Sequence, residues 1–135
     1  MARSSREQNH IRELLKVLVA APRMRFPVRR GTLEATKDQG VYLIFSPKGR
    51  VLHVGMTPKA RHGIWQRLRD HLATQSSFTN VYMKGDGSKL RSGCSYSFLV
   101  VTNRRHRALL EALAIGHLCP AHIGNSSVLK KIVAR

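Results

Sequence analysis

Two short apolar runs on either side of a turn signal constrain the fold of this chain more than any other feature. Residues 41–45 read Val-Tyr-Leu-Ile-Phe, residues 51–54 read Val-Leu-His-Val, and a Ser-Pro-Lys-Gly turn signal lies between them at residues 46–49. Runs rich in β-branched and aromatic residues that flank such a turn predict a β-hairpin. The hairpin would place Tyr42 on one arm and His53 on the other, at nearly the same level across the turn.

Three stretches with helical periodicity accompany the hairpin. The first has Ile11, Leu14, Leu15 and Leu18 on one face, begins at a capping-box spacing from Ser5 to Gln8, and ends before Pro22. The others are predicted over residues 62–73 and 104–118, and Pro120 closes the last. With a third strand over residues 96–101, the order predicts an α+β fold, a small three-stranded antiparallel sheet flanked by helices.

The remaining segments are read from their composition. Residues 23–38 are predicted to be a basic connector, residues 74–92 a long loop with an extended piece at 81–83, and the end of the chain a short helix packed on the body. The length of 135 residues fits one domain. Within it we expect an N-terminal helix and connector (1–37), a core (38–125) and a C-terminal segment (126–135).

The charge of the chain indicates a polyanionic partner. Lys and Arg number 24 against seven Asp and Glu, which gives a net charge of +17, and nucleic acid is the first candidate. A membrane is not expected, because the most apolar N-terminal run, residues 14–21, is short and contains Lys16. Cys94 and Cys119 form no Cys-x-x-Cys pair, so we expect core thiols, no disulfide-linked partner and an intracellular, cytoplasmic protein.

Glu111 is an acid in an unusual position, because it lies in the apolar stretch Ala-Leu-Leu-Glu-Ala-Leu-Ala-Ile of residues 108–115. An unpaired buried carboxylate would be costly. It can be satisfied by an ion pair with Arg104, Arg105 or Arg107, or by a hard divalent cation such as Mg²⁺. On another helix, Arg67 and His71 are four residues apart and flank the apolar stripe. An arginine and a histidine so placed can bind a phosphate.

Taken together, these features resemble the signature of the GIY-YIG nuclease superfamily over about residues 38–125. The paired motif corresponds to Gly-Val-Tyr at 40–42 and His-Val-Gly at 53–55, followed by the helix with Arg67 and His71. A glutamate in an apolar helix, then a proline and an asparagine, correspond to Glu111, Pro120 and Asn125. Two departures are clear: His53 replaces the second tyrosine, and about four extra residues lie around 58–63.

The resemblance implies hydrolysis of a phosphodiester with one Mg²⁺ or Mn²⁺ ion bound by Glu111. Arg67 would bind the scissile phosphate with His71 nearby, Tyr42 would take a proton from the attacking water, and Asn125 would orient Glu111 or the C-terminal segment. His53 is an alternative base, a proton relay or a phosphate ligand. The substitution at position 53 leaves these alternatives open.

The expected substrate is nucleic acid, with DNA taken from the resemblance, and with weak sequence specificity or a preference for a strand or shape. The basic residues expected to contact it are Lys48, Lys59, Arg61, Arg69, Lys84, Lys89 and Arg91. Two alternatives remain at this stage. One is a site-specific enzyme of the restriction or homing type, and the other is a basic module that binds nucleic acid without cutting it.

Overall fold

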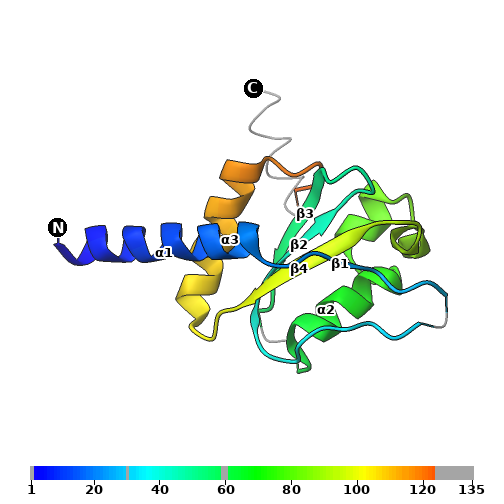
Figure 1. The fold of residues 1–135 in the computed structure, drawn as a ribbon, viewed down its shortest axis with the longest axis horizontal. Helices are drawn as coiled ribbons and strands as arrows, with labels where there is room; N and C mark the ends of the chain where they lie inside the picture. The colour runs from blue at the N-terminus through cyan, green and yellow to red at the C-terminus, as the bar shows by residue number, and fades with distance from the viewer. Residues whose placement is uncertain (1, 30, 59–60, 124–135) are drawn as a thin grey trace.

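A four-stranded antiparallel sheet with helices on both faces forms the body of the protein in the computed structural model, which describes residues 2–29, 31–58 and 61–123 (Figure 1). The strands follow the order β1 (Met24–Arg25), β4 (Ser95–Val100), β2 (Gly40–Phe45) and β3 (Val51–Met56). β2 and β3 form the predicted hairpin. The α+β class is therefore confirmed, with one strand more than expected.

The additional strand β1 has only two residues, Met24 and Arg25, which pair with Tyr96 and Ser95 of β4. So short a basic segment carries no alternating pattern, and only its pairing with β4 makes it a strand. The expectation of a plain connector over residues 23–38 is wrong at this point.

Central strand β2 is buried along its whole length because it contacts both layers of helices. Val41, Leu43 and Phe45 belong to a core cluster with α1 (Ala2–Ala20) and α3 (Arg104–Leu118). Tyr42 and Ile44 face the opposite side, toward α2 (Gly63–Leu72). Because side chains alternate along a strand, Tyr42 points to the α2 side of the sheet, while Val41 and Leu43 point to the apolar core beneath α1 and α3.

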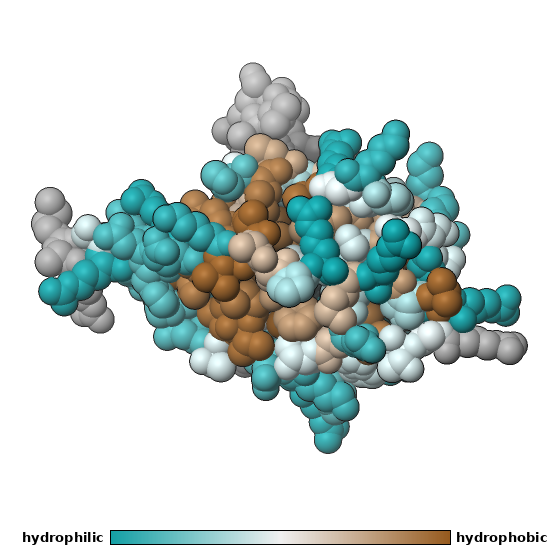
Figure 2. All heavy atoms as spheres, in the orientation of Figure 1, coloured by the Kyte–Doolittle hydropathy of each residue, from teal (hydrophilic) through white to brown (hydrophobic). Residues whose placement is uncertain are grey.

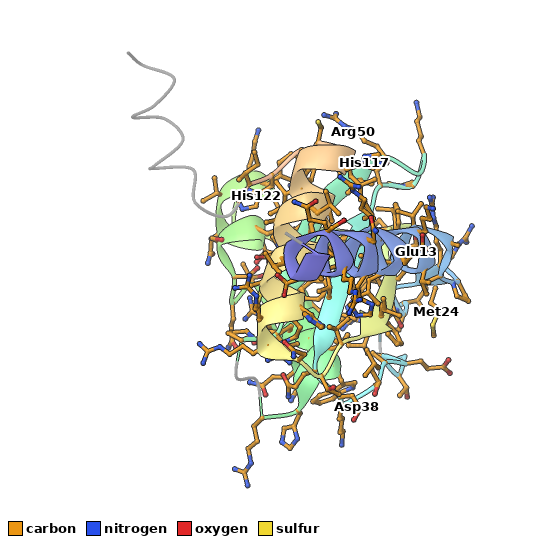
Figure 3. All side chains as sticks on the ribbon, turned by 90° about the vertical axis from the view of Figure 1, so that its left-hand side faces the viewer. Glu13, Met24, Asp38, Arg50, His117 and His122 are labelled. Atoms are coloured by element: carbon orange, nitrogen blue, oxygen red, sulfur yellow. The ribbon has the colours of Figure 1, made fainter. Side chains whose placement is uncertain are left out.

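The helix α1 begins before the predicted capping box. It starts at Ala2, so Ser5 lies inside the helix and does not cap it. The α1 side chains Ile11, Leu15 and Leu18 are buried, and the helix lies across α3, as Figure 3 shows. In the orientation of Figure 1, apolar surface gathers where α1 meets α3, with hydrophilic side chains around it (Figure 2).

Residues 74–92 contain two helical turns where a loop was expected. A π-helical turn, η1 (Phe78–Tyr82), and a 3₁₀ turn, η2 (Gly87–Arg91), each bury one apolar side chain completely, Phe78 and Leu90. The predicted extended piece at 81–83 is wrong, since burial of these two residues on the α2 face decides the local backbone. The predicted C-terminal helix lies outside the described residues.

No helix in the described ranges is both long and apolar enough to cross a membrane. The two cysteines differ in exposure: Cys94 is buried and Cys119, at the end of α3, is exposed. The expectation of a core thiol is therefore confirmed for Cys94 and wrong for Cys119, which follows α3 in a left-handed conformation.

Candidate active site

A pocket of about 270 Å³ opens at the free edge of β3, between α2 and α3. It is placed where the two helical layers meet beside the edge strand, so side chains from both layers reach it. The polar and charged side chains that line it are Tyr42, His53, Arg67, His71, Ser76, Ser77 and Glu111. The structure therefore brings together every described residue that the sequence assigned to catalysis.

The Tyr42 side chain extends over β3 to this edge because the residue opposite it on β3 is a glycine. Tyr42 pairs with Gly55 of β3, and a Cβ atom at Gly55 would lie 2.3 Å from the Tyr42 hydroxyl. Such a contact is far too short for any side chain. The glycine of the second motif therefore makes room for the tyrosine ring of the first motif, which is fully buried.

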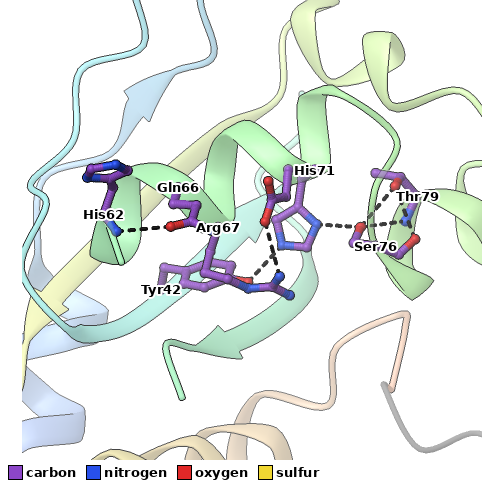
Figure 4. A network of polar contacts seen from close by, with 8 residues as sticks. Tyr42, His62, Gln66, Arg67, His71, Ser76 and Thr79 are labelled. Carbon is purple, nitrogen blue, oxygen red and sulfur yellow. Dashed lines mark hydrogen bonds and ion pairs between the residues drawn. The ribbon is translucent and has the colours of Figure 1, made fainter. Parts of the chain in front are cut away.

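A chain of hydrogen bonds fixes the orientation of the tyrosine hydroxyl (Figure 4). The Tyr42 hydroxyl lies 2.7 Å from His71 Nε2, His71 Nδ1 lies 2.7 Å from Ser76 Oγ, and Ser76 Oγ lies 2.9 Å from Thr79 Oγ1. The Thr79 hydroxyl donates to the Ser76 carbonyl, and the Thr79 amide donates to Ser76 Oγ.

These contacts determine which atom donates in each bond. Because the Thr79 hydroxyl already donates to a carbonyl, it accepts from the Ser76 hydroxyl, and Ser76 Oγ then accepts from His71 Nδ1–H. His71 Nε2 is left with a lone pair and accepts from the Tyr42 O–H. The phenol proton therefore points to His71, and the phenol oxygen accepts a hydrogen bond from Arg67, which leaves one lone pair for a further donor.

Burial keeps this pair uncharged. It raises the pKa of Tyr42 to about 12, although the charge and a hydrogen bond of Arg67 act in the opposite direction. Burial, followed by the charges of His53 and Arg67, lowers the pKa of His71 well below its usual range. At neutral pH the protein thus holds a neutral phenol against a neutral imidazole.

The internal contacts of His71 leave neither ring nitrogen free for the substrate phosphate that the sequence suggested. Its side chain is 1% exposed and both ring nitrogens are hydrogen-bonded inside the protein. The expectation that His71 flanks the buried face of its helix is wrong, because His71 belongs to that face with Ile64 and Leu68. Its hydrogen bond orients the Tyr42 hydroxyl.

Arg67 lines the pocket with Tyr42 and Glu111, and its charge acts on the pKa of both groups. Its guanidinium is 3.4 Å from the Asp70 carboxylate, and the Arg67 side chain is 30% exposed, so the group is held from one side and open on another. Its buried Nε has no hydrogen-bond partner among the described residues. A planar donor group with unused capacity at the wall of a pocket suits a phosphate.

Glu111 is not satisfied by the arginines of its own helix. Arg105 pairs with Glu7 of α1, and Arg107 donates to the carbonyls of Val101 and Thr102. No ion pair with Glu111 is found in the described part of the chain. Burial raises the pKa of Glu111, while the charge of Arg67 and a hydrogen bond from the Met56 backbone lower it.

This environment fits a divalent cation. Glu111 offers a half-buried oxygen ligand at a pocket wall, without a lysine or arginine occupying it, which is what a hard cation needs. The described residues contain no cluster of three or more His, Cys, Asp or Glu side chains able to bind a metal. Any cation there would depend on one protein carboxylate, with water and substrate oxygens completing its coordination.

His53 lines the same pocket but is poorly suited to accept a proton. It pairs with Ile44 of β2, next to an irregularity in the register, and its ring stacks on Phe78 at 4.8 Å between centroids. Burial, with smaller contributions from His122 and Arg67, lowers the pKa of His53 to about 3. An imidazole with that pKa stays neutral and is a weak base near neutrality.

The predicted nucleic-acid contacts divide into three groups. The exposed ones are Lys48, Arg61, Arg69, Lys84 and Lys89. Arg91 is half-buried and donates to the Pro27 and Val28 carbonyls, so it also holds the connector. Lys59, like the predicted catalytic residue Asn125, lies outside the described residues.

Sequence reasoning missed Ser76 and Thr79, which complete the network behind His71. They lie in the segment expected to be a loop, and nothing in its composition distinguishes them from surface serines and threonines. His122 was missed as well, and it packs on His53 with 5.5 Å between ring centroids. Only the tertiary structure brings these residues to the site.

Comparison with known proteins identifies related structures. No family model matches the sequence, and no curated protein matches it significantly. Among solved structures, the chain is similar to the GIY-YIG N-terminal endonuclease domain of UvrC from Thermotoga maritima bound to magnesium. That match has 26% identity and a TM-score of 0.51, and covers 73% of this chain and 97% of that one. A point mutant of the same domain, bound to its catalytic divalent cation, matches with the same identity, TM-score and coverage.

Proposed function

We propose that this chain, which has a GIY-YIG-like fold, is a divalent-metal-dependent endonuclease that hydrolyses phosphodiester bonds, with DNA as substrate. One observation carries the proposal: a carboxylate without an ion-pair partner in the described residues, Glu111, shares a small pocket with Arg67 and Tyr42. An oxygen ligand, a guanidinium and a phenol are the groups that hydrolysis of a phosphate diester requires. The catalytic cation bound by the UvrC domain supports the same reading.

Glu111 would hold a Mg²⁺ or Mn²⁺ ion, one per site. When bound, such an ion neutralises non-bridging phosphate oxygens and the departing oxyanion. The Met56 backbone keeps the Glu111 carboxylate in place through a hydrogen bond. We propose that Asn125 supports Glu111 or the C-terminal segment, as expected from the sequence.

Arg67 would bind the scissile phosphate and oppose the charge that builds up as water attacks. Its partly exposed side chain at the pocket wall, and its charge acting on both Tyr42 and Glu111, support this role. Because the guanidinium is already held by Asp70, little conformational freedom would be lost when phosphate binds.

Tyr42 would position the attacking water and accept its proton. Since the phenol O–H donates to His71 Nε2 and Arg67 donates to one lone pair of the phenol oxygen, the other lone pair remains available to that water. His71 is no better a final proton acceptor than His53, because burial lowers its pKa in the same direction. Tyr42 would therefore take the water proton as phenolate, a form that the charges of Arg67 and of a cation at Glu111 would favour against the burial that raises its pKa. His71 keeps the tyrosine oxygen oriented. His53 is assigned a packing role beside them.

The nuclease proposal is tested with a carboxylate-to-amide pair. Glu111→Gln should abolish cutting of DNA in Mg²⁺ or Mn²⁺ and keep DNA binding, because it removes the metal ligand but leaves the basic surface. Glu13→Gln, an exposed acid of α1 whose pair with Lys16 is also exposed, is the matched control and should cut normally.

Cleavage products would be resolved on gels, and binding would be followed by the anisotropy of a labelled oligonucleotide. EDTA should stop cutting by the unmodified protein. DNA binding without cleavage by the unmodified protein in either metal would instead establish a basic binding module and refute the enzyme. Cleavage of one defined sequence alone would refute weak specificity and favour a restriction- or homing-type enzyme.

A further inference from the structure

The single tryptophan of the chain, Trp65, has two positively charged side chains over its ring and lies away from the active site. Trp65 is half-exposed on α2, with Lys37 Nζ 5.4 Å and Arg69 Cζ 5.3 Å from the ring centroid. Because α2 turns about 100° per residue, Trp65 and Arg69 lie on one flank of the helix and Arg67 on the opposite flank. The catalytic mechanism uses neither Trp65 nor Lys37.

A second pocket, of about 480 Å³, opens beside this tryptophan. One wall comes from α2 through Trp65, Arg69 and Leu72, and the other from the connector through Pro27 and Leu33. In Figure 1 the connector between β1 and β2 runs alongside α2. The pocket has the size of a small-molecule site.

Hydrogen bonds hold the walls in place before any ligand arrives. The Trp65 amide donates to the Thr36 carbonyl at 2.8 Å, which fastens the connector to the first turn of α2. Arg91, which also lines the pocket, donates to the Pro27 carbonyl at 2.9 Å. A preformed pocket loses less entropy on binding than one that must assemble.

The side chains that line the pocket indicate which class of ligand fits it. The indole supplies an aromatic ring, the exposed side chains of Arg69 and Lys37 lie over that ring, and Arg91 adds positive charge at the pocket wall. A flat ring joined to a phosphate satisfies both features, because the base stacks on the aromatic and the phosphate meets the cations. A base is free to enter such a pocket only when it is unpaired and unstacked.

We propose that this pocket binds an unpaired base of a DNA strand, stacked on Trp65, with its backbone phosphate at Arg69. The inference rests on the proposed function and gives it a substrate class: DNA with a single-stranded segment near the cleavage site. The pocket and the active site lie on opposite flanks of α2, so the diameter of one helix, about 10–12 Å, separates them. A strand of a few nucleotides spans that distance.

Trp65 itself reports on the pocket, because no other tryptophan contributes fluorescence. Titration in EDTA, where cutting is absent, should show quenching of the tryptophan by single-stranded oligodeoxynucleotides and little quenching by a blunt duplex of equal length. Anisotropy of the same labelled oligonucleotides would measure binding in parallel. Binding of the single strand with unchanged tryptophan emission would overturn the proposal.

Matched variants separate stacking from charge. Trp65→Ala should weaken single-strand affinity about 5- to 150-fold, the range that follows from the loss of one stacked base. Trp65→Phe, which keeps an aromatic face, should restore most of it. Tyr82→Ala removes an aromatic that is 39% exposed outside this pocket and should leave affinity unchanged. Equal losses for Trp65→Ala and Tyr82→Ala would contradict a specific stacking site.

The exposed Arg69 provides a variant expected to fold if Trp65→Ala does not. Arg69→Gln should weaken single-strand binding and the tryptophan quenching together, and unchanged quenching would count against the pocket. Quenching as strong with a free mononucleotide, or tighter binding of RNA than of DNA, would overturn the assignment to a DNA strand. If the protein cuts DNA in Mg²⁺ but DNA does not quench the Trp65 fluorescence, the base-binding pocket is refuted and the nuclease proposal stands. If DNA quenches the fluorescence but is not cut, the nuclease proposal is refuted.

Discussion

Mild acid is expected to destabilise the fold, because His53 and His71 are buried as neutral imidazoles. Their exposed fractions are 8% and 1%. Burial lowers the pKa of His53 from 6.5 to about 3 and lowers that of His71 in the same direction. The unfolded chain therefore binds protons first as the pH falls, so the free energy of unfolding decreases below pH 6.5 and continues to decrease until the folded pKa is reached.

The size of the effect follows from the difference between the two pKa values of His53. Between 6.5 and about 3, each pH unit removes about 1.4 kcal/mol of stability through His53. At pH 5, His53 alone would cost about 2 kcal/mol relative to neutral pH. That is a large part of the ~5–15 kcal/mol that stabilises a typical domain. His71 adds to the loss with the same sign.

Urea unfolding followed by circular dichroism at pH 7, 6 and 5 measures this dependence. His53→Gln removes the titrating group while keeping a polar side chain of similar size, so its stability should fall less between pH 7 and 5, by about 2 kcal/mol. His117→Gln removes an exposed histidine of α3 and is the matched control, expected to keep the slope of the unmodified protein. If His53→Gln kept that slope as well, the neutral, buried state of His53 would be refuted.

Two further substitutions test the geometry around the tyrosine. Tyr42→Phe keeps the buried ring but removes the oxygen that contacts His71, so cleavage assays should show a loss of about 10²-fold or more while circular dichroism shows a native fold. Normal cleavage would exclude Tyr42 as the proton acceptor. Gly55→Ala brings a Cβ atom within 2.3 Å of the tyrosine hydroxyl and should lower both the cleavage rate and the free energy of unfolding, the latter by about 1–3 kcal/mol in urea. An unchanged stability would mean that Tyr42 does not cross β3 at this point.

Local patterns in the sequence determined most of the elements. The hairpin around residues 46–49, and the helices now bounded as 63–72 and 104–118, follow from periodicity and turn residues, which act over a few positions. The same patterns, with the family resemblance, identified Tyr42, Arg67 and Glu111 as candidates, and the structure gathers them in one pocket. Sequence order alone was enough here because each residue sits on a regular element with a defined face.

Tertiary structure decided which groups meet. Glu111 has three arginines within seven residues in the sequence, yet the guanidinium that influences its pKa belongs to Arg67, on a different helix. His71 was expected at the surface, but packing of α2 on β2 buries it against Tyr42 and Ser76. Met24 and Arg25 form a strand only because they pair with β4. Hydrogen-bond partners and burial depend on contacts between distant segments, and periodicity within one segment carries no information about them.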